Sequence, residues 1–276
     1  MTDMTRRAFN AAAASAGFAL AVQPVSAETI TTPDAGLVAG MVKFATGGLE
    51  MDAFRAAPEG KKGAPVILVV QEIFGLHEHI RDVCRRFARE GFYAIAPNLY
   101  QREGDATAVA DIQTLVDTIV SKVPDAQVMA DLDAALEFAR ADGADANRAG
   151  VTGFCWGGRI TWLYAHHRPA LKAGVAWYGR LVGEANELRP KHPADIGAQL
   201  TVPVLGLYGG ADRGIPNDTV EQMRAEIAKS SSGSDIVLYP DAPHGFLADY
   251  RDTYRADVAA DAWGRCVAWF RTHGLA

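Results

Sequence analysis

The sequence predicts an α/β fold in which helices cover both faces of a mostly parallel central sheet. Two observations support this prediction. Short runs of β-branched and other apolar residues, such as VILVV at 66–70, alternate along the chain with segments of helical periodicity. These runs are apolar without interruption, which is typical of strands that are buried on both faces of a parallel sheet.

The first expected elements are two antiparallel strands, residues 41–44 and 49–55, joined by a Gly-Gly turn. The parallel pattern begins after this hairpin. Its first expected elements are strand 66–70, helix 79–90, strand 93–96, helix 106–118 and helix 125–141. Gly91 follows the first of these helices and Gly143 follows the last, each at the position where glycine commonly ends a helix.

The alternation continues through the second half of the chain. The expected elements are strand 149–154, helix 157–166, strands 173–178 and 202–208, helix 217–229, strand 235–239 and a final helix over 251–273. Parallel strands in such a sheet end at the same edge, and ligands bind beyond their carboxyl ends. We therefore expect the chemistry of the protein at the residues that follow the strands.

Residues 1–27 have the three regions of a bacterial export signal. A pair of adjacent arginines precedes a weakly apolar run over residues 11–22, and an A-x-A-like cleavage site follows. Arginine pairs in this position are typical of the twin-arginine type of signal. We expect a cleaved signal and a single periplasmic domain, residues 28–276. The alternative is a short N-terminal helix that stays attached.

The net charge of the 276-residue chain is −6, which argues against the clustered basic surface of a nucleic-acid-binding or anionic-membrane protein. No G-x-G-x-x-G or Walker sequence is present, so nucleotide binding has no support. His77 and His79 lack the i, i+4 spacing that places two zinc ligands on one helix face. We expect a monomer that needs no cofactor or metal and acts on a small molecule.

Cys155 differs in its surroundings from Cys84 and Cys266, which fall within helical patterns as small buried residues. A disulfide between Cys84 and Cys266 stays open as an alternative. Cys155 stands in GFCWG, the G-x-S-x-G pattern with sulfur in place of the hydroxyl, which puts a nucleophile on a sharp strand-to-helix turn. The turn is expected to direct the N–H of Trp156 at the reacting carbonyl, and the helix N-terminus favours a thiolate.

Reactive side chains follow four of the expected strands, at one edge of the sheet. They are Glu72, Cys155, Asp212 and His244. The order nucleophile, acid, histidine is the one that α/β-hydrolases use. In this arrangement His244 takes the proton from Cys155, while Asp212 fixes the tautomer of the imidazole. Each residue alone has an ordinary structural explanation, but their order and shared edge favour a catalytic site.

The chain resembles the dienelactone hydrolase (carboxymethylenebutenolidase) family, small α/β-hydrolases with a Cys-His-Asp triad. The resemblance covers about residues 64–274, and its most specific motifs are QEIFG at 71–75, PNLYQR at 97–102, GFCWGG at 153–158 and PHGF at 243–246. It implies that Glu72 interacts with the resting thiol and helps to form the thiolate, a role that a raised carboxyl pKa would suit. It also implies that the N–H of Ile73 completes the oxyanion hole.

Substrate binding is implied by the same resemblance at three further residues. Arg102 matches an arginine that binds the substrate carboxylate, with Tyr100 and Tyr178 lining the pocket. Guanidinium suits a carboxylate because it donates two parallel hydrogen bonds. The chain departs from the family at Ala248, where the best-known members have a second arginine, and Arg251 is the nearest substitute.

The sulfur nucleophile favours an activated substrate. A thiolate is expelled readily from a tetrahedral intermediate, so the competing leaving group must be better still. Enol lactones release an enolate and meet this condition. We expect hydrolysis of such a lactone or ester through an acyl-thioester on Cys155, with dienelactone to maleylacetate as the type reaction. The alternatives are another esterase or thioesterase of the same fold and a non-catalytic periplasmic small-molecule binding protein.

Overall fold

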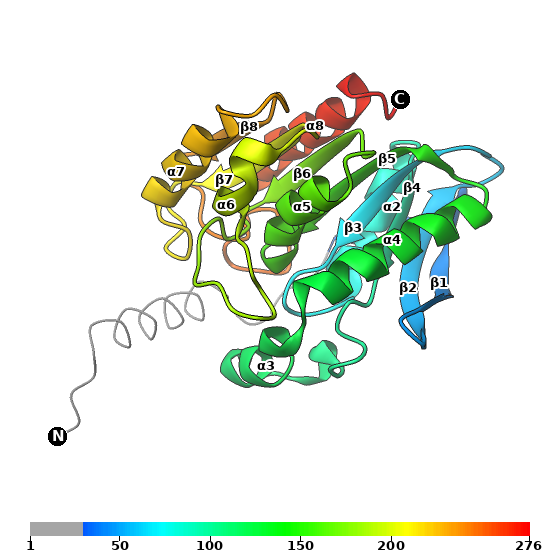
Figure 1. The fold of residues 1–276 in the computed structure, drawn as a ribbon. Helices are drawn as coiled ribbons and strands as arrows, with labels where there is room; N and C mark the ends of the chain where they lie inside the picture. Colours follow the sequence, from blue (N-terminus) through cyan, green and yellow to red (C-terminus); the bar gives the residue numbers. More distant parts are fainter. Residues whose placement is uncertain (1–29) are drawn as a thin grey trace.

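The computed structural model describes residues 30–276, so the expected signal at residues 1–27 lies outside the described residues. One sheet runs through the described chain in the order β1-β2-β4-β3-β5-β6-β7-β8 (Figure 1). Its strands are β1 (Leu37–Thr46), β2 (Leu49–Pro58), β3 (Pro65–Val70), β4 (Tyr93–Pro97), β5 (Asp145–Phe154), β6 (Ala173–Trp177), β7 (Val204–Gly209) and β8 (Asp235–Tyr239). β2 is antiparallel to β1 and β4, and every other pair is parallel. The predicted fold class is confirmed.

Helices cover both faces of this sheet. They are α2 (Glu78–Arg89), α3 (Ile112–Thr118), α4 (Asp125–Ala141), α5 (Trp156–His167), α6 (Pro193–Ile196), α7 (Asn217–Ile227) and α8 (Ala256–Thr272), with short 3-10 turns η1 (Ala106–Ala108), η2 (Val120–Lys122) and η3 (Gly197–Gln199). α4 and α5 lie on one face, and α2 and α8 on the other (Figure 1). Across the first face the Tyr164 hydroxyl donates to Asp133, and across the second Phe87 packs on Trp263 with ring centroids 4.6 Å apart.

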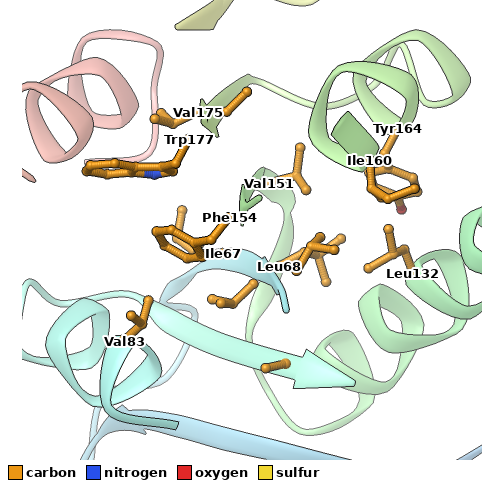
Figure 2. Packing of buried hydrophobic residues seen from close by; sticks show 14 of the residues in the cluster. Ile67, Leu68, Val83, Leu132, Val151, Phe154, Ile160, Tyr164, Val175 and Trp177 are labelled. Carbon is orange, nitrogen blue, oxygen red and sulfur yellow. The ribbon is translucent and has the colours of Figure 1, made fainter. Parts of the chain in front are cut away.

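The core fills the space between the sheet and both helix layers. Figure 2 shows Val83 of α2 on one side of the central strands, and Leu132 of α4 with Tyr164 of α5 on the other. All six residues of β3 are buried, which explains why its sequence is apolar without alternation. Each such side chain contributes about 1.5–3 kcal/mol by leaving water, so the strands that carry the site are held rigidly.

Three segments differ from the sequence prediction. The helix expected over 106–118 is broken into η1 and α3, because Asp105 and Asp111 each begin a new turn by accepting a hydrogen bond from a backbone N–H two or three residues later. The last helix begins at Ala256 and not at residue 251. The chain between β6 and β7 contains α6 and η3, which have too few residues to produce a periodic pattern.

Candidate active site

The nucleophile elbow predicted at Cys155 is formed by a tight turn between β5 and α5. Cys155 has φ 55° and ψ −112°, a conformation that is rare for a residue with a side chain. A Cβ atom at Gly153 would lie 2.2 Å from the carbonyl oxygen of Gly157, and one at Gly157 would lie 2.4 Å from that of Val70. Because no larger residue fits at either glycine, the GFCWG sequence allows strand and helix to approach this closely.

Asp212 and His244 follow β7 and β8 and contact each other at the same edge of the sheet. Nδ1 of His244 lies 2.6 Å from Oδ2 of Asp212, and the other carboxylate oxygen accepts the N–H of Gly214 at 2.7 Å. Burial disfavours the imidazolium, but the charges of Asp212 and Cys155, with hydrogen bonds to both, raise the pKa of His244 to about 10. The structure therefore joins His244 to Asp212 by a hydrogen bond and places Cys155 near enough for its charge to act on the imidazole.

The raised pKa of His244 gives a direct test of this arrangement. We expect the His244 imidazole to titrate near pH 10 in an NMR titration, with a His244→Asn variant used for assignment. In Asp212→Asn the main favourable charge is gone while burial remains, so the pKa of His244 should fall. A His244 pKa near 6.5 in the unaltered protein would contradict the contact with Asp212.

Ile73 and Trp156, whose backbone N–H groups are expected to form the oxyanion hole, line the same cavity as Cys155. Trp156 is the first residue of α5, where helix geometry leaves N–H groups without intrahelical acceptors. Ile73 lies in the loop after β3, and within residues 30–276 its N–H has no backbone acceptor. Both residues line the cavity with Cys155. Their positions are compatible with the oxyanion hole that the sequence predicts.

Glu72 is fully buried and is held by three neighbouring side chains. One carboxylate oxygen accepts from Arg251 at 3.0 Å, and the other accepts from the Tyr250 hydroxyl and lies 3.5 Å from Nε2 of His77. Burial acts to raise the pKa of Glu72, but the charge of Arg251 and the contacts with His77 outweigh it and hold that pKa well below its usual range. The raised pKa expected from the sequence is therefore wrong, because Arg251 stabilises the carboxylate.

The two arginines considered for substrate binding both have partners inside the protein. Arg102 forms a two-pronged ion pair with Asp131 of α4, with distances of 2.6 and 3.0 Å, and also donates to the Thr46 carbonyl oxygen. Arg251 is buried against Glu72, with its guanidinium 5.0 Å from the centre of the Phe74 ring. Neither arginine lines the cavity beside Cys155, so we exclude both from the substrate site.

Tyr100 and Tyr178 are fully buried behind the site. The Tyr100 ring packs edge-on against Trp156 at 4.9 Å, and the Tyr178 ring packs against His244 at 5.1 Å. Neither is among the residues that line the cavity. Both rings therefore pack behind Trp156 and His244 and hold the shape of the site. The direct substrate contact that the resemblance implies for them is not seen in this cavity.

The cavity beside Cys155 has a volume of about 230 Å³ and a strongly basic wall. Its lining residues are Ile73, Gln113, Val116, Val120, Cys155, Trp156, Arg159, Arg180, Arg189 and His192. The sequence analysis did not identify the three arginines or His192. Arg180 follows the end of β6 by three residues, so the rule that strand ends carry ligand contacts could have found it. Arg189 and His192 lie in an aperiodic stretch that gives no such signal.

The described residues also bear on the expectations for disulfides, metal sites and membrane-spanning helices. Cys84, Cys155 and Cys266 all carry free thiols within residues 30–276, and no disulfide joins them. Over the same residues no cluster of three His, Cys, Asp or Glu side chains could hold a metal ion. None of the described helices has the length and apolar character to cross a membrane.

Known proteins are similar to this chain over most or all of its length. Residues 51–274 match the Dienelactone hydrolase family. A protein of Methylorubrum extorquens named "Putative carboxymethylenebutenolidase" is 56% identical over 277 residues, covering 100% of this chain and 95% of its own. A protein of the same name from Salmonella typhimurium is 54% identical over 94% of this chain and 96% of its own.

A solved structure is also similar to this chain in both fold and sequence. The crystal structure described as "Putative Dienelactone Hydrolase" from Klebsiella pneumoniae superimposes with a TM-score of 0.83 and 55% identity, covering 85% of this chain and 98% of that one. The fold, the strand-end residues and these similarities agree. The chain belongs to the dienelactone hydrolase family and is a hydrolase of the α/β-hydrolase fold.

Proposed function

We propose that the protein hydrolyses a small activated ester, most simply an enol lactone, with Cys155 as nucleophile, His244 as general base and acid, and Asp212 as the group that orients His244. The single observation that carries the proposal is the Asp212–His244 hydrogen bond, whose imidazole lies within electrostatic reach of Cys155 at the wall of a cavity. The 2.6 Å contact at Nδ1 leaves Nε2 as the ring nitrogen available for proton transfer with the sulfur.

The proposed reaction has two steps. The Cys155 thiol gives its proton to His244 as the sulfur attacks the ester carbonyl, and the N–H groups of Ile73 and Trp156 stabilise the oxyanion of the tetrahedral intermediate. The C–O bond breaks, His244 gives its proton to the leaving oxygen, and the acyl group stays on sulfur as a thioester. Water then attacks the thioester while His244 accepts its proton. The C–S bond breaks as His244 returns this proton to the sulfur, which releases the acid and restores the thiol.

Glu72 has a positioning role in this proposal. Its carboxylate precedes Ile73 directly and is tied to Arg251 and Tyr250. These contacts support a fixed position for the oxyanion-hole N–H of Ile73. They leave the carboxylate paired with the Arg251 cation, and its lowered pKa makes it a poor acceptor for the Cys155 proton.

The substrate class follows from leaving-group chemistry and from the family. An enolate is a better leaving group than an alkoxide, so a thiolate nucleophile suits an enol lactone. The relatives' shared name refers to a carboxymethylene butenolide, which is an unsaturated lactone that carries a carboxylate. The cavity volume of about 230 Å³ lies below the ~300–1,000 Å³ of typical sites for drug-sized ligands, which supports a compact substrate.

A substrate panel tests this proposal against its alternatives. We expect turnover of cis- or trans-dienelactone, the type substrates, and of 4-nitrophenyl acetate, with slower turnover of an acyl-thioester. Thioester hydrolysis far above lactone hydrolysis would support a thioesterase instead. Binding of a lactone without turnover of any compound would support a non-catalytic binding protein.

We also propose that residues 1–27 direct the protein to the periplasm through the twin-arginine pathway. The proposal rests on the sequence pattern alone. A reporter fused after residue 30 should be exported, and replacing Arg6 and Arg7 with lysine should stop export. A reporter that stays in the cytosol with both arginines present would contradict this location.

A further inference from the structure

The basic wall of the cavity comes from two segments of the chain. Arg159 comes from the first turn of α5, four residues after Cys155, and Arg180, Arg189 and His192 come from the chain that follows β6. Within residues 30–276, no Asp or Glu side chain lines this cavity. Such a wall attracts an anionic group into a site that otherwise presents Ile73, Val116, Val120 and Trp156.

Arg159 serves as the scaffold of this wall. Its guanidinium forms a two-pronged ion pair with buried Asp125, at 2.7 and 2.8 Å, and donates to the Lys191 carbonyl oxygen at 2.8 Å. Its Nε lies 3.3 Å from Nδ1 of His192. All of its nitrogen atoms are therefore engaged by protein groups. Arg159 fixes the segment that carries Arg189 and is not the group that would receive a ligand.

His192 is held in the neutral form by the same contacts. Its Nε2 lies 3.2 Å from the Glu184 carbonyl oxygen, which can only accept, so Nε2 carries the proton. Nδ1 then accepts from Nε of Arg159. Burial and the charge of Arg159 lower the pKa of His192, which agrees with a neutral ring. Besides Arg159, the described residues give the wall two cations, Arg180 and Arg189, and both line the cavity.

Arg180 and Arg189 are partly buried and line the same cavity as Arg159 and Cys155. Burial, together with repulsion from Arg159, lowers the pKa of both, although the charge of Cys155 acts in the opposite direction on Arg180. The charge of Arg189 also opposes the rise that burial causes in the pKa of Tyr100. Nη2 of Arg189 donates to the Val120 carbonyl oxygen. A bound anion would relieve the repulsion among these guanidinium groups.

We propose that Arg180 and Arg189 bind a carboxylate of the substrate, so that the enzyme selects compact activated esters or lactones that carry a free carboxylate a few bonds from the scissile carbonyl. The inference rests on the proposed function of Cys155 and replaces the carboxylate contact implied for Arg102, which is engaged by Asp131. The carboxylate site then lies on the chain after β6, on the cavity wall beside the nucleophile.

The test compares two esters of equal length, 4-nitrophenyl hydrogen glutarate and 4-nitrophenyl pentanoate. We expect the unaltered enzyme to prefer the anionic ester in kcat/KM. In Arg180→Gln and Arg189→Gln that preference should fall about 10- to 100-fold, mainly through KM, the scale of a lost charge-assisted hydrogen bond. Arg102→Gln is the matched control, because it removes a guanidinium outside the cavity and should leave the ratio of the two esters unchanged.

A binding measurement separates this inference from the proposed chemistry. Glutarate should bind to Cys155→Ala in calorimetry, and adding Arg180→Gln should weaken that binding about 10-fold or more. If neither ester is hydrolysed but glutarate binds and depends on Arg180, the chemistry is wrong and the carboxylate site stands. An unchanged ester ratio in both arginine variants, or glutarate binding that does not depend on Arg180, would overturn the carboxylate site.

Discussion

Replacement of Cys155 by alanine is expected to lower kcat on 4-nitrophenyl acetate and on a lactone substrate by about 10⁴-fold or more. The variant retains the elbow, His244 and Asp212 but has no atom that can form the acyl bond. Losses of this size are typical when one member of a catalytic triad is removed. Initial rates corrected for spontaneous hydrolysis measure the effect, and an unchanged melting temperature shows that the fold is retained.

Cys84→Ala is the matched control for this loss. Cys84 is also a buried cysteine, but it lies in α2 and packs in the core. We expect it to keep its rate within about threefold. A second check is the double variant Cys155→Ala with His244→Ala, which should be no slower than Cys155→Ala alone because the two groups act as a unit. Residual turnover above a tenth of the normal rate in Cys155→Ala would rule out the proposed nucleophile.

Glu72→Gln is expected to lower the free energy of unfolding by about 3–5 kcal/mol, the cost of leaving a buried charge without its partner. The side chains of Glu72 and Arg251 are both fully buried, so the guanidinium cannot regain water when the carboxylate is neutralised. For a domain of this size the loss corresponds to roughly 10 °C or more in the melting temperature. Thermal and urea unfolding measure it.

Two comparisons make the Glu72 result specific. Glu72→Gln with Arg251→Met should recover part of the lost stability, because it removes both charges. Asp261→Asn breaks the exposed ion pair with Arg265 and should change stability by about 1 kcal/mol or less. A Glu72→Gln loss as small as that of Asp261→Asn would contradict the buried pair.

The dependence of stability on pH has a defined sign at Glu72. Its pKa in the folded protein is lowered, so its carboxylate contributes fully above the unfolded pKa of about 4.3. The contribution is lost as the pH falls below that value toward the folded pKa. Acid unfolding of Glu72→Gln should therefore be less steep than that of the unaltered protein.

The fold could be predicted from sequence because its strands are buried on both faces. A run such as residues 66–70 contains no polar residue, as expected for a strand that helices cover on both faces of the sheet. Its pattern therefore predicts the strand and also the helix layers on either side of it. The break between η1 and α3 was missed because Asp105 and Asp111 act through local side-chain hydrogen bonds, which leave the apolar periodicity unchanged.

The site was only partly predictable, for a related reason. Cys155, Asp212 and His244 each follow a strand whose end the sequence marks, so their meeting at one edge could be expected. The ion pair between Arg102 and Asp131 could not be predicted, because Asp131 lies on a helix 29 residues away and no local pattern joins the two residues. Arg180 and Arg189 of the cavity wall lie in a long connection without periodicity, and only the folded chain brings them to one cavity.

The central claim is that an acyl group is carried on the Cys155 sulfur during turnover. The most direct test is to quench the reaction with a slowly hydrolysed activated ester and to map the added mass by peptide mass spectrometry. The account predicts one acyl group on the peptide that contains Cys155, lost on mild hydroxylamine treatment and absent from Cys155→Ala. An acyl group on any other residue, or full turnover with no adduct and with Cys155 replaced, would contradict it.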